Sequence, residues 1–386
     1  MHVSALTPAV LADLRRPRPY PAISLVMRTH PRRGVDEDRV RLKNLLSEAR
    51  ARLSADPRVG REERLELQAR LEETEVLGRD DVFLHAGAGL QILLAPGEET
   101  QVWQLDGEED VPTRVEFAPT FLTRYLVAAR ERSAPYWVLV LGLDTCRLYQ
   151  GSAGRLFEVE EHGFPAEPAI PDPEDALPGP VTDFPSPARD ERIQQYMRAV
   201  DEKLAAPLAA RRQPLFLVGG TKLLAEFDGV SRHADRVDGR LDLVGLDEVS
   251  PAVLAERLEP VLSGFRERQT HRALQDLDDA RGRKQYAAGL QDVWVAVADR
   301  RVHLLVLEEG LRAAGTVAED GRGLRLVPLP DGPGLTDGGG EQAPDGVVTD
   351  LVDTLVENAL DADASVRFVP DGTLNERGRV VAALRY

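Results

Sequence analysis

The sequence has one cysteine, Cys146, among 386 residues, so no intrachain disulfide can form. A single thiol is typical of a reducing compartment. No run approaches the roughly 18 apolar residues of a membrane-spanning helix. The first residues, Met1–Pro17, also lack the apolar core of a secretion signal. These absences predict a cytoplasmic protein, and its length predicts two or three domains.

The common sequence signatures of catalytic and cofactor sites are also missing. There is no GxxxxGK[ST] phosphate loop, no Gly-x-Ser-x-Gly nucleophile elbow and no GxGxxG between a strand and a helix. Gly87-Ala88-Gly89 precedes a strand and is read as a turn. No two of the seven histidines have the i, i+4 spacing of a zinc-binding helix. We therefore expect neither a metal nor a cofactor.

Charge is unevenly distributed along the chain. The net charge of −17 comes from 48 Lys and Arg against 65 Asp and Glu, and a uniformly acidic protein should repel nucleic acid. Residues 1–60, however, hold 12 basic and 6 acidic residues, which leaves −23 on the remainder. The N-terminal region is thus the first place to look for an anionic partner, although a chance fluctuation on a solvated surface explains the numbers equally well.

Apolar patterns predict alternating strands and helices, and hence α/β domains with mixed sheets and flanking helices. Strands are expected at Ile23–Met27, Gly89–Pro96, within Tyr136–Glu161, and at Pro214–Gly220, Ser365–Val369 and Val380–Tyr386. Helices are expected at Leu42–Leu53, with Asp36 or Asp38 as N-cap, and at Arg61–Val76, Phe121–Arg132, Ile193–Leu208, Leu254–Phe265 and Val348–Ala359.

Three further segments need separate interpretation. The stretch Gln291–Gly310 fits both a strand and a helix, and we interpret it as a helix to about Arg300 followed by a strand at Val302–Leu307, because one strand of that length is implausible. Pro165–Pro187, with eight prolines, and the Gly-rich Pro328–Gly346 are predicted loops. Loops of this length are usually functional or disordered.

The densest polar cluster joins the first predicted strand to its helix. Its candidate nucleic-acid-binding residues are Arg28, His30, Arg32, Arg33, Arg39, Arg41 and Lys43, accompanied by Thr29 and Asn44. Arginine forks bind phosphate at two points, and helix N-termini favour anions. The structural alternative is a solvated loop whose arginines pair with Asp36, Glu37 and Asp38.

Several segments, in order, resemble the archaeo-eukaryotic peptide release factor superfamily, which includes Pelota-like rescue factors, and most closely its bacterial branch. ISLVMRTH and DRVRLKNLL are similar to the start of that bacterial group. YWVLVLGLDTCRLYQGSAGRLFEVE, ARDERIQQYMRAVDEKL and PLFLVGGTKLLAEF resemble the middle domain. GRKQYAAGLQDVWVAVADRRVHLLVLEEG and GRVVAALRY resemble the third domain, which implies an RNA-binding ribosomal-protein fold.

The resemblance implies three α/β domains, placed at residues 1–115, 116–271 and 272–386, with the Pro-rich loop in the second. Hydrolytic members of the superfamily carry Gly-Gly-Gln just before the long middle-domain helix, where this chain has Asp183-Phe184-Pro185-Ser186-Pro187. Proline lacks the backbone N–H and the flexibility that catalysis there needs. No catalytic residue is therefore carried over, and Arg41–Asn44 does not match the codon-reading motif.

The sequence thus predicts a non-hydrolytic translation-associated factor that binds the ribosome or tRNA-like RNA, in rescue, stalling or hibernation. Its partners would be the ribosome, tRNA or rRNA, together with a basic ribosomal protein or a translational GTPase. One alternative is a hydrolase or nuclease that uses the Arg28–Asn44 cluster, with His30, Asp36 and Asp38 as acid–base groups. Another is a stress-associated protein-interaction module without RNA.

Overall fold

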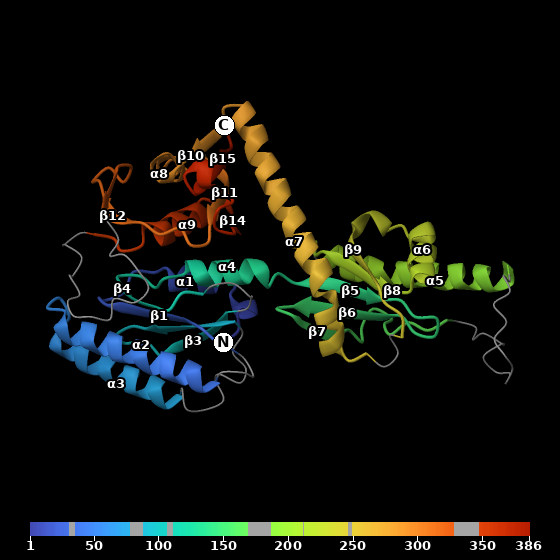
Figure 1. Ribbon diagram of the computed structural model, residues 1–386, viewed down its shortest axis with the longest axis horizontal. Coiled ribbons are helices and arrows are strands. Elements are labelled where there is room, and N and C mark those ends of the chain that lie inside the picture. The colour runs from blue at the N-terminus through green and yellow to red at the C-terminus, as the bar shows by residue number, and fades with distance from the viewer. Residues whose placement is uncertain are drawn as a thin grey trace. The chain divides into compact units, whose positions relative to one another are not determined.

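The computed structural model describes residues 1–30, 35–77, 88–105, 111–168, 187–210, 212–245, 249–327 and 347–386. They form two compact units, one of Met1–Ser133 with Thr270–Tyr386 and one of Ala134–Gln269. Each combines sheets with flanking helices (Figure 1), which confirms the predicted α/β class. The division into three domains stays a prediction. Its boundary near Val115 lies inside strand β4 (Arg114–Ala118), and its boundary near His271 lies inside helix α7 (Pro251–Gly282).

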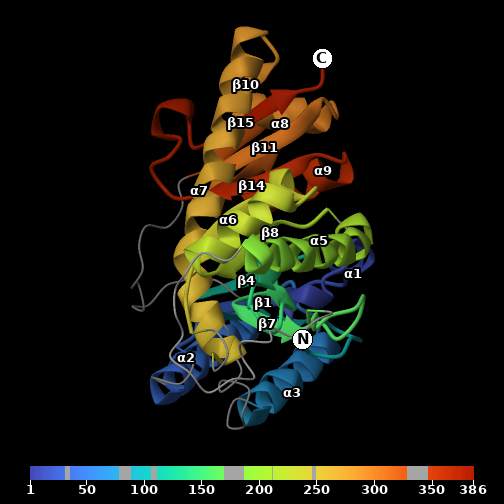
Figure 2. The same cartoon turned by 90° about the vertical axis from the view of Figure 1, so that its right-hand side faces the viewer.

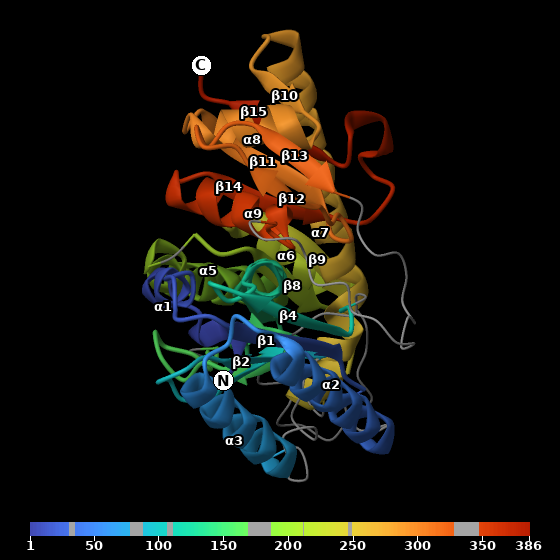
Figure 3. The same ribbon diagram turned by 90° about the vertical axis from the view of Figure 1, so that its left-hand side faces the viewer.

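The first sheet has the order β3 (Gln101–Leu105), β2 (Gly89–Leu94), β1 (Ala22–Arg28) and β4, with antiparallel neighbours throughout. Helices α2 (Val35–Ala55) and α3 (Arg61–Leu77) lie side by side against one face (Figure 3). Helices α1 (Pro8–Leu14) and α4 (Arg124–Arg132) pack on the other. Helices cover both faces, so β1 is apolar from Ala22 to Met27 except for Ser24 and does not alternate between apolar and polar residues.

The unit Ala134–Gln269 is built on a mixed sheet. Its order is β7 (Arg155–Glu158), β6 (Arg147–Ser152), β5 (Tyr136–Val140), β8 (Leu215–Gly219) and β9 (Val237–Asp242). The pairs β5–β8 and β8–β9 are parallel, and the others are antiparallel. Helices α5 (Pro187–Ala210) and α6 (Thr221–Val230) cover one face, and the first part of α7 covers the other.

The C-terminal sheet has the order β10 (Tyr286–Ala288), β15 (Val380–Leu384), β11 (Val302–Glu308) and β14 (Ser365–Val369). Helices α8 (Leu290–Ala298) and α9 (Leu351–Asp361) pack on one face, and the last part of α7 packs on the other (Figure 2). A hairpin of β12 (Ala314–Val317) and β13 (Leu324–Val327) completes the described part. The ambiguous stretch Gln291–Gly310 is a helix followed by a strand, as predicted.

Three predicted helix starts are wrong. Helix α2 begins at Val35, so Asp36 and Asp38 lie in its first turn instead of capping it. Helix α4 begins at Arg124, after the buried Phe121 and Leu122. Helix α9 begins at Leu351, because the carboxylate of Asp350 accepts hydrogen bonds from the backbone N–H groups of Val352 and Asp353 and so fixes the N-cap.

Helix α7 has 32 residues and is much longer than the predicted Leu254–Phe265. Its apolar residues fall into two sets that pack in different cores. Leu254, Leu258 and Leu262 pack with the sheet of Ala134–Gln269, whereas Ala273, Leu277 and Ala280 pack with the C-terminal sheet. Among the helices that the structure describes, none combines the length and the apolar character that crossing a bilayer requires.

Candidate nucleic-acid interface

The predicted basic cluster lies where strand β1 passes into helix α2. The structure describes five of its seven candidate residues, Arg28, His30, Arg39, Arg41 and Lys43. Arg32 and Arg33 fall outside the described residues. The buried side of α2 is formed by Leu42, Leu45, Leu46, Ala49 and Leu53, as the apolar spacing predicts. The basic residues occupy the other positions around the helix.

Two of the five candidate residues are tied to a buried carboxylate. Asp38 is 1% exposed, and its Oδ2 accepts a hydrogen bond of 2.6 Å from the backbone N–H of His30. Its Oδ1 lies 3.1 Å from His30 Nδ1 and accepts a bond of 2.6 Å from Arg41 Nη1. Arg41 also donates to the carbonyl oxygen of Arg28, over 3.1 Å. Through Asp38, Arg41 and His30 thus join the end of β1 to the first turn of α2. For these two residues the structure favours a structural role over a contact with nucleic acid.

The other three candidates, Arg28, Arg39 and Lys43, are exposed at the surface. Arg39 and Lys43 are four residues apart and therefore neighbours on one face of α2. Arg39 Nη1 is 3.2 Å from Asp36 Oδ1, but this pair is exposed. Exposed pairs contribute only about 0–1 kcal/mol, so an anionic ligand can compete for such an arginine. These three residues can meet a phosphate without disturbing the core.

The rival hydrolase reading involves a histidine beside carboxylates. His30 and Asp38 are in contact, but Asp36 is exposed and paired with Arg39. Within the described ranges, no three His, Cys, Asp or Glu side chains are grouped so as to hold a metal ion. A second Asp–His contact occurs in the unit Ala134–Gln269, where Asp201 Oδ1 is 2.9 Å from His233 Nδ1 and 2.5 Å from Ser231 Oγ. Here the aspartate binds the serine, whereas a hydrolytic triad needs the histidine between the two.

Carboxyl groups with strongly perturbed pKa values lie elsewhere, between helices α4 and α9. Burial and the neighbouring carboxylate of Asp350 raise the pKa of Asp353 to about 7. Burial and the carboxylate of Asp353 raise the pKa of Glu357 to about 9. Burial also acts to raise the pKa of Asp350, but the guanidinium groups of Arg124 and Arg114 outweigh it and lower that pKa overall. Perturbed groups of this kind mark either functional sites or structural ion networks.

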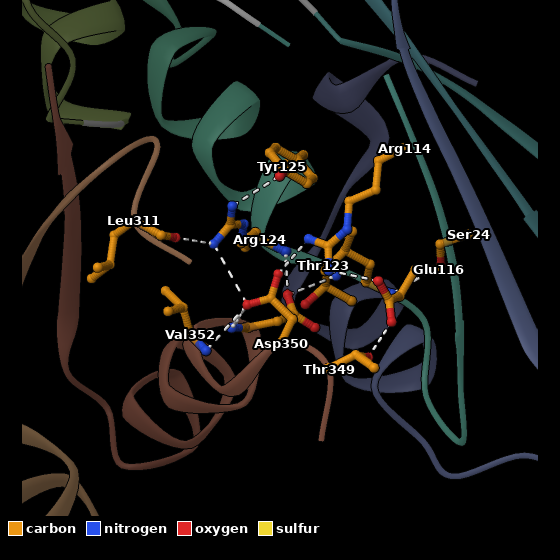
Figure 4. A network of polar contacts seen from close by, with 12 residues as sticks. Ser24, Arg114, Glu116, Thr123, Arg124, Tyr125, Leu311, Thr349, Asp350 and Val352 are labelled. Carbon is orange, nitrogen blue, oxygen red and sulfur yellow. Dashed lines mark hydrogen bonds and ion pairs between the residues drawn. The ribbon is translucent and has the colours of Figure 1, made fainter. Parts of the chain in front are cut away.

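The hydrogen bonds identify this group as structural. Asp353 Oδ1 accepts bonds of 3.0 Å and 2.7 Å from the backbone N–H groups of Thr123 and Arg124, at the start of α4. Thr123 is the N-cap of α4 but makes no side-chain capping bond itself. Arg114 binds Asp350 over 2.6 Å and Glu116 over 2.5 Å (Figure 4). The start of α4 is therefore capped by the side chain of Asp353 in α9, about 230 residues away along the chain.

No local sequence signal reveals this network, since charged residues are usually expected on the surface.

In the segment between β7 and α5, the place of a Gly-Gly-Gln loop, residues 169–186 fall outside the described part. Helix α5 begins at Pro187, directly after those residues in the chain.

Comparison with known proteins supports the resemblance found in the sequence. Residues 135–301 match the model of bacterial archaeo-eukaryotic release factor family 3. This range runs from β5 into α8 and to the start of β11. Over this range the chain is similar to that family. No curated protein matches the chain.

Solved structures of translation factors are also similar to the chain at low identity. The archaeal translation termination factor aRF1 is 15% identical, with 100% of this chain and 99% of that one covered and a TM-score of 0.27. Archaeoglobus fulgidus Pelota is 12% identical, with 77% and 79% covered and a TM-score of 0.36. Saccharomyces cerevisiae Dom34, described as a translation termination-like factor, is 11% identical, with 81% and 77% covered and a TM-score of 0.36.

Proposed function

We propose that this protein is a non-hydrolytic translation-associated factor that binds the ribosome or tRNA-like RNA. The observation that carries the proposal is the release-factor family match over residues 135–301 in a chain that has no Gly-Gly-Gln sequence. A factor of this kind acts by occupying a ribosomal site, in rescue, stalling or hibernation, without cleaving the peptidyl ester. A backbone amide in a flexible loop is what such cleavage needs, and prolines do not supply it.

The exposed residues Arg28, Arg39 and Lys43 would form the N-terminal contact with RNA phosphate. Phosphate contacts dominate RNA affinity and make it salt-dependent. The geometry determines which residues a test should replace. Arg41 is bonded to the buried Asp38, so its replacement would disturb the fold as well as any RNA contact. Lys43 is exposed and lies one helical turn from Arg39, so it is the better third position.

The test is co-sedimentation of the purified protein with ribosomes through a sucrose gradient over a series of salt concentrations. The triple variant Arg28→Glu, Arg39→Glu, Lys43→Glu should lose most of its ribosome association. Its log affinity should also depend on log salt with a slope smaller by about 2 to 3. Exposed substitutions usually change stability by less than about 0.5 kcal/mol each, so the variant should remain folded.

The matched control reverses three other exposed arginines, as Arg155→Glu, Arg232→Glu and Arg257→Glu. It carries the same change of charge and should sediment with ribosomes as the original protein does. If both variants lost ribosome association equally, the effect would come from net charge alone. If neither variant lost it, the N-terminal contact would be refuted. Peptide release from programmed ribosomes above a no-factor control would refute the non-hydrolytic assignment.

A further inference from the structure

A second group of basic residues lies at one end of the C-terminal sheet, far in sequence from the β1–α2 corner. We name it the basic edge and define it as Arg281, Arg283, Lys284, Arg300, Arg301 and Arg385. It gathers residues from the end of α7, the turn between α8 and β11, and the end of β15. Figure 1 shows the C-terminus close to β10 and β15.

The strand register and the turn before β10 bring three of these residues to one end of the sheet. Tyr286 pairs with Ala383 and Val302 pairs with Leu384, so β15 lies between β10 and β11. Beyond these pairs, the N–H of Leu384 donates to Gln285 O over 2.9 Å, and the N–H of Arg385 donates to Arg301 O over 2.8 Å. Arg385 and Arg301 are therefore neighbours on adjacent strands, which lie about 4.8 Å apart. Lys284 lies in the turn one residue before Gln285, at the same end of the sheet.

Two of the basic residues occupy backbone positions that usually belong to glycine. At the end of α7, Lys284 N–H donates to Arg281 O and Gln285 N–H donates to Ala280 O, which is the Schellman pattern. Arg300 and Arg301 make the same pair of bonds at the end of α8. Lys284 and Arg300 consequently have φ values of 60° and 55°. A side chain is unfavourable in this conformation, while a cation gains from the helix dipole, so helix stability alone does not favour lysine or arginine over glycine.

Few carboxylates neutralise the basic edge. Asp299 is bonded to Arg322 over 2.6 Å, and Asp278 to Arg377 over 2.8 Å. Arg385 donates to the backbone carbonyls of Ala362 and Asp363, which fixes its position without cancelling its charge. Arg301 donates to Tyr386 O over 3.3 Å.

The other four residues of the basic edge are exposed, and within the described ranges none of them forms an ion pair. They are Arg281, Arg283, Lys284 and Arg300. An unneutralised group of this size stands out in a chain with a net charge of −17.

We propose that the basic edge binds the phosphate backbone of a single-stranded RNA segment. The proposal deepens the proposed function and rests on it for the biological source of the RNA. Guanidinium forks match phosphate oxygens, and an exposed aromatic ring beside them provides a surface for stacking a base. Tyr386 is 70% exposed and directly follows Arg385. The ring and the forks together favour RNA over an acidic protein segment.

The test is fluorescence anisotropy of a labelled, unstructured RNA 12-mer titrated with the full chain. The variant Arg283→Glu, Lys284→Glu, Arg300→Glu should bind at least about tenfold more weakly, and its log–log salt slope should be smaller by about 2, as expected when three phosphate contacts to a single strand are lost. The control Arg155→Glu, Arg232→Glu, Arg257→Glu should bind within about twofold of the original protein.

A second variant removes charge while favouring the fold. Lys284→Gly with Arg300→Gly relieves both left-handed positions, so thermal unfolding should occur at the same or a higher temperature while RNA affinity falls. Weaker binding by this variant cannot be attributed to unfolding. Equal RNA binding by the basic-edge variants and the control would overturn the proposal.

Two further outcomes are informative. If a labelled poly-glutamate peptide bound as tightly as RNA and lost affinity in the same variants, the edge would be a site for acidic protein, and the RNA assignment would be wrong. If the original protein failed to sediment with ribosomes but still bound the 12-mer through the basic edge, the proposed function would fail and the RNA site would stand.

Discussion

Asp353 offers the sharpest test of how the buried network holds helices α4 and α9 together. Its Oδ1 accepts two backbone hydrogen bonds, from Thr123 and Arg124. Asp353→Ala leaves both N–H groups buried without an acceptor, at about 1–3 kcal/mol each. The free energy of unfolding should fall by about 2–4 kcal/mol. Asp353→Asn keeps an oxygen in place and should cost less than about 1 kcal/mol at pH 5.

Asp353→Ala and Asp353→Asn also distinguish the capping of α4 by the Asp353 oxygen from the effect of the charge on Asp353. Burial and Asp350 raise the pKa of Asp353 from 3.8 to about 7. An acid whose folded-state pKa is raised contributes stability that is complete below about pH 4 and is lost as the pH rises through about 7. The slope is at most about 1.4 kcal/mol per pH unit for one proton, so between pH 5 and pH 7 the original protein should lose at least about 2 kcal/mol relative to Asp353→Asn. Asp353→Asn also removes the charge that raises the pKa of Glu357, which adds to the difference.

The assay is urea unfolding at pH 5, 6, 7 and 8, followed by tryptophan fluorescence. Trp103 and Trp294 lie in the core that contains α4 and α9, whereas Trp137 lies in a core of the other unit. Asp276→Asn, at an exposed position of α7, is the matched control. Parallel pH profiles for the original protein and Asp353→Asn would refute the buried-proton argument. Equal stability of Asp353→Ala and Asp353→Asn would refute the capping argument.

Two further carboxylates support predictions of opposite kinds. Asp38→Ala should lower the free energy of unfolding by about 2–3 kcal/mol, because three donors lose a buried acceptor, and urea unfolding at pH 7 measures it. Burial acts to raise the pKa of Asp201, but hydrogen bonds from Ser231, Arg232 and His233 lower it overall. Its contribution to stability is therefore present above about pH 4 and is lost on acidification, so Asp201→Ala should flatten the acid limb of the pH–stability profile.

The secondary structure that the sequence predicted correctly follows from strong local patterns. Ile23–Met27 is apolar on both faces because helices cover both sides of its sheet, and Leu42–Leu53 repeats at helical spacing. Elements with weak patterns were not predicted. Helix α6 has ten residues and starts after Gly220, which has no side chain to cap it. In the sequence, Gly219-Gly220 therefore indicated only the end of a strand. The short strands β3 and β9 are only partly buried and carry little periodicity.

The candidate site could be located from the sequence but not resolved into roles. The local excess of arginine identified the β1–α2 corner, yet no pattern distinguishes Arg41, which binds Asp38, from Lys43, which faces solvent. That difference depends on which side of α2 meets the sheet. The network around Asp350 and the basic edge both bring together residues that are far apart along the chain, so only the fold reveals them.

The net charge of −17 does not oppose an RNA contact at either basic surface, because charge acts over a limited distance in physiological salt. Exposed charges further apart than about 8 Å are largely screened from each other there. Arg283 and Lys284 are therefore governed by their immediate neighbours, and the nearby carboxylates of Asp278 and Asp299 are engaged with other arginines. The acidic surface elsewhere repels RNA that approaches without meeting a basic site. A local group of cations on an acidic chain would therefore meet RNA at fewer places than a uniformly basic protein would, which would favour discrimination over affinity.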